Sequence, residues 1–93
     1  MKKGILIKLD RERYLKFTLN SVRILEKEYN ISLDKIGEDF AMEKIQMLLH
    51  VGLLKDDPEL TFEEVGELVD MSNMKIVVEA LTQALGGLQD QSN

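Results

Sequence analysis

The stretch LTFEEVGELVD, residues 60–70, carries the strongest structural signal in this chain of 93 residues. Thr61 and Glu64 form a capping box, in which each side chain accepts a hydrogen bond from the backbone N–H of the other residue. The apolar residues on either side of this box are spaced as a hydrophobic staple, which fixes how the chain enters a helix. The pattern predicts a helix over about 62–71, with apolar side chains on one side and acids on the other.

Before this helix, apolar residues recur first at every second position and then at about every third or fourth position. Alternating apolar and polar residues, separated by a polar turn, predict a β-hairpin over about 4–17. Thr18 is a suitable N-cap for a helix over about 19–29, and Asn30 can close that helix in a left-handed conformation. Because a lone hairpin is only marginally stable in water, the helices are expected to cover it.

Two more helices are predicted, one before the capping box and one after it. Apolar residues recur at helical spacing over about 40–54 and again over about 74–85. Gly86-Gly87 is expected to stop the last helix, and residues 87–93 are expected to form a frayed polar tail. The sequence therefore predicts an α+β fold, mostly helical, with about four helices and a small N-terminal hairpin.

Length and composition place the chain in the class of small soluble domains. Hydrophobic residues make up 44% and charged residues 31%, and residues 1–86 are expected to form one domain. The chain has no cysteine, no apolar run of the roughly 20 residues that span a bilayer, and no recognisable signal segment at its start. We therefore expect a cytoplasmic protein without a membrane partner.

Charge is unevenly distributed along the sequence. The net charge is −5, yet residues 1–17 sum to +4, residues 38–60 to −4 and residues 61–93 to −5. One interpretation is that the basic start discourages edge-to-edge aggregation of the hairpin. The other is that the acidic part steers a basic partner. An acidic chain is a poor partner for nucleic acid, so a protein partner is expected.

No combination of residues predicts catalysis, cofactor binding or a metal site. His50 is the only histidine, and its position predicts a solvated surface side chain. Asp56, Asp57 and Glu59 lack the spacing of a calcium loop and predict a solvated turn. The glycines are scattered, without the spacing of a phosphate-binding loop. We therefore expect that the chain is not an enzyme.

The predicted helix over 40–54 has more apolar residues than one buried stripe requires. One interpretation is a central helix with neighbours on both sides. The other is that its second face docks a partner, widened by Ile76 and aligned by the acids Glu63 and Glu67. A surplus apolar face would also favour self-association. The first face comprises Met42, Ile45, Leu48, Leu49, Gly52 and Leu53, and the second comprises Met47, Val51 and Leu54.

An alternative function follows from the last two predicted helices. The segment TFEEVGELVDMSNMKIVVEAL, residues 61–81, has the spacing of a helix-turn-helix, which would make the chain a prophage DNA-binding regulator. A recognition helix presents basic or amide side chains to DNA. Here Lys75 is the single basic residue of the segment, and the preceding helix is acidic. Charge therefore disfavours this alternative.

Two segments resemble a known family. These are GLLKDDPELTFEEVGELVD, residues 52–70, and KLDRERYLKFTLNSVRILEKEYNISL, residues 8–33. They are similar to the small tail assembly chaperones of long-tailed bacteriophages and related prophages, and the first segment is the more diagnostic. The chain departs from the family pattern at Asn30-Ile31, where a glycine often follows the first helix.

The resemblance implies a function in phage tail construction. It implies a non-catalytic chaperone that binds the tail tube protein and the tape measure protein in the cytoplasm of the bacterial host. It also implies absence from the mature virion, and many members have a longer form made by frameshifting. The family provides no catalytic residues to transfer to this chain.

Overall fold

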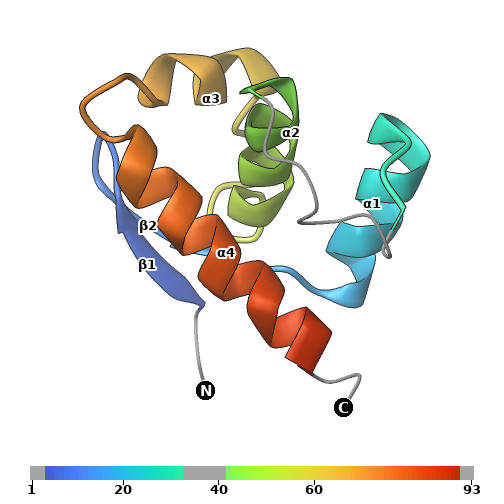
Figure 1. The fold of residues 1–93 in the computed structure, drawn as a ribbon. Helices are drawn as coiled ribbons and strands as arrows, with labels where there is room; N and C mark the ends of the chain where they lie inside the picture. The colour runs from blue at the N-terminus through green and yellow to red at the C-terminus, as the bar shows by residue number, and fades with distance from the viewer. Residues whose placement is uncertain (1–3, 33–41, 91–93) are drawn as a thin grey trace.

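The computed structural model describes residues 4–32 and 42–90, with the last four of these as backbone only. Within these residues, α2 lies between the other elements, α4 crosses the hairpin, α3 runs along one end and α1 lies to the side (Figure 1). The predicted α+β fold, with a hairpin and four helices, is confirmed. The elements in chain order are β1 (Ile5–Lys8), β2 (Glu12–Leu15), α1 (Leu19–Tyr29), α2 (Met42–Leu53), α3 (Phe62–Leu68) and α4 (Met74–Asp90).

The hairpin pairs β1 with β2 in antiparallel register, with Leu6 opposite Tyr14 and Ile7 opposite Arg13. Side chains alternate between the two faces of a strand, so Ile7 and Leu15 point inward and are buried while Leu6 is half exposed. Both α4 and α2 pack against the strands. The expectation that helices cover the hairpin is confirmed.

Both predicted ends of α1 are confirmed. The hydroxyl of Thr18 accepts a hydrogen bond from the backbone N–H of Ser21, and the Ser21 hydroxyl accepts one from the backbone N–H of Thr18. Asn30 closes the helix with a positive φ of 56°. The next backbone N–H, of Ile31, donates to the Leu25 carbonyl at 3.0 Å, which satisfies an end carbonyl of the helix.

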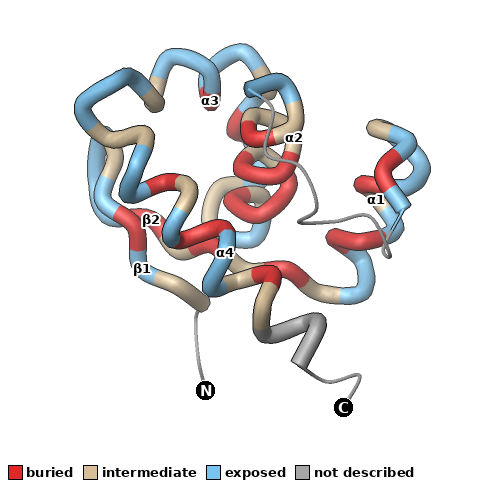
Figure 2. The backbone as a smooth tube through the Cα atoms, viewed as in Figure 1, coloured by how far each residue is buried: buried red, intermediate tan, exposed pale blue. Residues whose placement is uncertain are grey.

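The central position of α2 explains its two apolar faces. α2 contacts α1 and α3, and also β2 and α4, and half of its residues are buried (Figure 2). Buried side chains occur on both faces, including Leu48 on the first and Val51 on the second. The helix ends at Leu53, one residue earlier than predicted, and its predicted first residues, 40–41, lie outside the described residues.

α3 begins as predicted but ends earlier. The Thr61–Glu64 capping box is present, with hydrogen bonds of 2.9 and 3.1 Å. The helix stops at Leu68 instead of residue 71, because Val69 adopts an extended backbone with ψ 128°. The Asn73 side-chain amide then donates to the Leu68 carbonyl at 2.9 Å, which satisfies the helix end without a further turn of helix.

α4 is longer than predicted and continues through Gly86-Gly87 to Asp90. A glycine stops a helix when it adopts a left-handed conformation. Among the described residues, positive φ occurs only at Gly4 and Asn30, so both glycines keep helical geometry. The prediction that this pair ends the helix is wrong, and α4 includes residues 87–90 of the predicted tail. Residues 91–93 lie outside the described part.

Candidate functional site

The second face of α2 is largely covered by the chain itself. Val51 is 1% exposed and belongs to the hydrophobic core, so the interpretation that it lies on a docking face is wrong. Met47 is half-buried and packs against the same core, and Leu54 lies half-buried in the turn after α2. Ile76, on α4, is 50% exposed. The neighbours of α2 on both sides account for this surplus of apolar residues.

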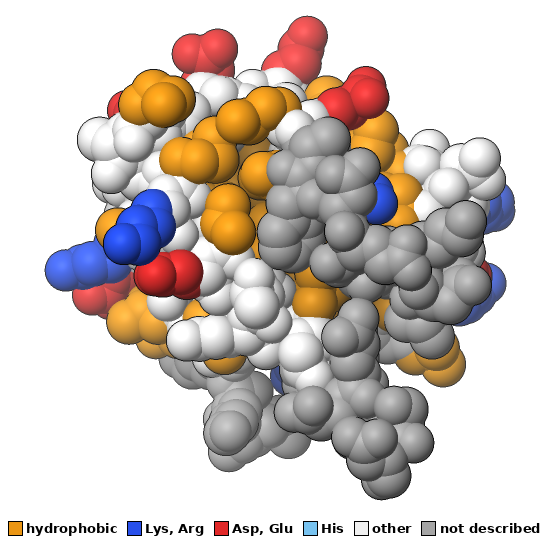
Figure 3. All heavy atoms as spheres, in the orientation of Figure 1, with side chains coloured by type: hydrophobic (Ala, Val, Ile, Leu, Met, Phe, Trp, Pro, Cys, Tyr) orange, Lys and Arg blue, Asp and Glu red, His pale blue; other side chains and the backbone are white. Residues whose placement is uncertain are grey.

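An apolar groove lies instead where α2, α3 and the start of α4 meet. Its volume is about 130 Å³. Hydrophobic side chains gather on this side of the molecule beside α3, and acidic side chains follow the same edge (Figure 3). We call this cavity the groove, and its lining residues are Met42, Ile45, Gln46, Leu49, Val65, Gly66, Val69 and Met74.

The floor and the walls of the groove differ in accessibility. Ile45, Leu49 and Val65 are buried and form the floor. Met42, which is 65% exposed, and Met74, which is half-buried, form accessible walls. Methionine is flexible and polarisable, so such walls adapt to different apolar groups. Sequence periodicity assigned Met42, Ile45 and Leu49 to the first face of α2 but gave no sign that this face is incompletely covered.

Two hydrogen bonds from α2 hold α3 beside the groove. The Gln46 side-chain amide donates to the Phe62 carbonyl at 2.9 Å. The His50 ring pairs its Nε2 with the Leu60 carbonyl at 2.9 Å, so Nε2 carries the proton and donates. The other ring nitrogen, Nδ1, then accepts from the Tyr29 hydroxyl at 3.0 Å.

His50 is therefore not the solvated surface side chain that was predicted. Both of its ring nitrogens are hydrogen-bonded, and the ring packs edge-on against Tyr29 and Phe62. It joins α1, α2 and the segment that leads into α3. Burial, with a smaller contribution from the charge of Glu28, raises the pKa of the Tyr29 hydroxyl. The hydroxyl stays protonated as the donor of this bond at neutral pH.

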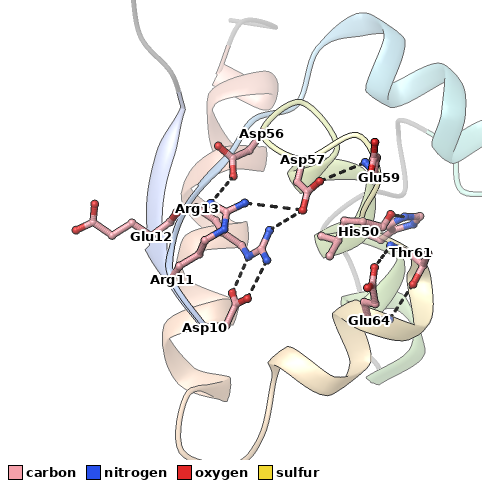
Figure 4. A network of polar contacts seen from close by, with 11 residues as sticks. Asp10, Arg11, Glu12, Arg13, His50, Asp56, Asp57, Glu59, Thr61 and Glu64 are labelled. Carbon is pink, nitrogen blue, oxygen red and sulfur yellow. Dashed lines mark hydrogen bonds and ion pairs between the residues drawn. The ribbon is translucent and has the colours of Figure 1, made fainter.

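The predicted solvated turn of Asp56 and Asp57 is also wrong, because both carboxylates pair with the hairpin (Figure 4). Arg13 is 5% exposed and donates twice to Asp10, at 2.8 and 2.9 Å, and once to Asp57, at 3.3 Å. Arg11 pairs with Asp56 at 3.4 Å. The side-chain hydrogen bond from Arg13 lowers the pKa of Asp10 below its usual value.

Strand alternation contains the signal that would have identified Arg13. In the predicted hairpin, Leu15 and Phe17 share one face, and Arg13 lies on that same face two residues earlier. A charged residue on a buried face requires countercharges. The nearby acids of the turn and of the Asp56-Asp57 loop could have been proposed on that ground.

The acids of α3 differ from Asp56 and Asp57 in their ion pairing. Glu63 and Glu67 are exposed, as predicted, and lie one turn apart. Glu64 is engaged in the capping box. Within residues 4–32 and 42–90, no ion pair involves an acid of α3. We call Glu63 and Glu67 the acidic rim.

The comparisons with known proteins leave the chain without an assigned family. No protein family, curated protein or solved structure matches it. In the part of the chain that the structure describes, no group of three or more His, Cys, Asp or Glu side chains is placed to hold a metal ion. None of the helices there has the length and apolar character needed to cross a bilayer.

Proposed function

We propose that this chain is a non-catalytic tail assembly chaperone that binds the tail tube protein or the tape measure protein during tail construction. The proposal joins the resemblance of residues 8–33 and 52–70 to one structural observation: an apolar groove remains open beside an acidic rim. Unassembled tail proteins expose apolar surface that later becomes an interface. A chaperone that covers such surface must bind it reversibly.

The dimensions of the groove fit reversible binding. Its volume of about 130 Å³ limits the apolar area that one chain can bury there. Interfaces of low area bind weakly and dissociate readily. The protein then acts in the cytoplasm of the bacterial host and leaves before the virion is complete.

Co-purification of the chain with the tail tube and tape measure proteins of the same genome tests this proposal. Met42→Lys places a charge on the exposed wall of the groove, and we expect it to reduce capture about tenfold. The matched control is Leu19→Lys, which changes an apolar residue of α1 that is 76% exposed and lies outside the groove. Circular dichroism and urea unfolding verify that both variants fold.

Three results would contradict the proposal. One is that the wild-type chain captures neither tail protein. Another is that Leu19→Lys reduces capture as much as Met42→Lys. The third is tight binding of duplex DNA in a gel shift at low salt, which would favour the helix-turn-helix alternative formed by α3, the following turn and α4.

A further inference from the structure

The groove has room for one large apolar side chain. Its volume is about 130 Å³, and a cavity of about 150 Å³ lined by aliphatic residues holds a benzene-sized group. The groove therefore accommodates a single Phe-, Leu- or Met-sized side chain, and any further contact with a partner would lie outside it. The specificity of binding then depends on what surrounds the groove.

The acidic rim continues directly from the apolar lining. A shallow surface beside the groove is lined by Gln46, Glu63, Glu64, Gly66 and Glu67. Gln46 and Gly66 line both this surface and the groove, so the two are contiguous. A group that enters the groove places its neighbours within reach of the rim carboxylates.

The sequence around the rim is acidic between Lys55 and Lys75. Residues 56–74 contain seven acids and no lysine or arginine. Asp56 and Asp57 are paired with the hairpin arginines, but Glu63 and Glu67 have no ion pair among the described residues. Like charges four residues apart on a helix repel each other, and a cation between them relieves the repulsion.

Building on the proposed function, we propose that the groove takes a basic helical segment of the partner, with one apolar anchor in the groove. Lysine or arginine side chains of that segment face Glu63 and Glu67. The two glutamates are separated by about 6 Å along α3, since a helix rises about 1.5 Å per residue. A partner helix lying along α3 matches that spacing with two basic residues four positions apart.

Synthetic peptides provide a direct test. The probe is a fluorescein-labelled, alanine-based helical peptide with two lysines four positions apart and one phenylalanine, and its binding to the full chain is measured by fluorescence anisotropy at low salt. Matched peptides replace both lysines with glutamate, or the phenylalanine with alanine. We expect each replacement to weaken binding about tenfold.

Charge reversal in the protein gives the decisive comparison. Glu63→Lys/Glu67→Lys should weaken binding of the lysine peptide about tenfold and restore binding of the glutamate peptide. The control, Glu26→Lys/Glu79→Lys, changes net charge equally at two exposed acids of α1 and α4, and should weaken binding less than twofold. Restored binding is a readout that mere destabilisation of α3 would not produce.

Five results would overturn the inference. Three of them are that none of the peptides binds, that the alanine replacement binds as well as the phenylalanine peptide, and that both charge-reversed proteins lose binding equally. Self-association that Met42→Lys abolishes would instead identify a second copy as the occupant. Capture of tail proteins that is insensitive to Glu63→Lys/Glu67→Lys would remove the inference and leave the proposed function. Peptide binding without capture of either tail protein would keep the inference about the groove and contradict the proposed function.

Discussion

The two junctions that α2 makes, one with the hairpin and one with α3, differ in how completely they are closed. We call the first the hairpin junction, where Gly52 meets β2 and the loop after α2 pairs with Arg11 and Arg13. The second is the α3 junction, where side chains of α2 hold the start of α3. The hairpin junction has paired charges and tight packing, whereas the α3 junction has a groove and acids without an ion pair in the part of the chain that the structure describes.

This difference shows that acidic residues close together in sequence have different roles. Asp56 and Asp57 neutralise cations of the same chain, including a buried arginine, so their charge contributes to folding. Glu63 and Glu67 have no such cation within residues 4–32 and 42–90, and both are exposed. Only the second pair leaves its charge available to a partner. The acidic part of the sequence therefore cannot be treated as one surface.

The largest effect is expected from removing acids at the hairpin junction. Asp10→Asn/Asp57→Asn leaves the guanidinium of Arg13 buried without a countercharge. We expect the free energy of unfolding to fall by about 2–3 kcal/mol, less than the roughly 3–5 kcal/mol of a fully buried pair because Asp10 is half exposed. Urea unfolding at neutral pH measures it.

The same experiment at the α3 junction provides the control. Glu63→Gln/Glu67→Gln should change stability by no more than about 0.5 kcal/mol.

The pH dependence of unfolding provides a second test of the ion pair between Arg13 and Asp10. Because the pKa of Asp10 is lower in the folded state than its ordinary value of 3.8, its stabilisation is present above that pH and is lost as pH falls below it. The gap between wild type and Asp10→Asn/Asp57→Asn should narrow there, and a constant gap would contradict the assignment.

Glycine substitutions compare the packing of the two junctions. A Cβ at Gly52 would lie 2.5 Å from Leu15 Cδ1 and 2.9 Å from Phe17 Cζ, both in the buried core. Gly52→Ala should therefore lower stability by about 1–2 kcal/mol, despite the better helix propensity of alanine.

At Gly66 the nearest atom to an added Cβ is the side-chain nitrogen of Gln46, at 2.7 Å. That nitrogen donates to the Phe62 carbonyl, so its displacement weakens this hydrogen bond at a cost of about 0.5–1.5 kcal/mol. Gly66→Ala should change stability by less than about 0.5 kcal/mol, because helix propensity offsets the displacement. Thermal unfolding compares the two variants. Equal losses would mean that the α3 junction is packed as tightly as the hairpin junction.

Local patterns in the sequence were sufficient for most of the fold. Capping residues and periodicity predicted α1 to the residue and the first residue of α3, because these signals depend on neighbours within one turn. The end of α4 was wrong because two adjacent glycines suggest a stop locally, while the structure keeps both in helical geometry.

The candidate site was harder to predict because it depends on contacts distant in sequence. Whether Val51 is buried or lies on a docking face was left open, since periodicity does not reveal how many neighbours a helix has. His50 was assigned to solvent, although Tyr29 and Leu60 come from other elements to bind its ring. The exposure of the rim acids, in contrast, followed from the polar face of α3 alone.

A smaller loss than at the hairpin junction is expected at the α3 junction from Tyr29→Phe. This change removes the hydroxyl that donates to His50 Nδ1, and a half-buried nitrogen can accept from water instead. We expect a loss of about 0.5–1 kcal/mol in urea unfolding. A double-mutant cycle with His50→Gln isolates the bond, because glutamine offers a donor to the Leu60 carbonyl but no equivalent of Nδ1 to Tyr29. Tyr29→Phe should then cost almost nothing in the His50→Gln background. An unchanged cost would mean that Tyr29 stabilises α1 by another contact and that the α3 junction does not depend on this pair.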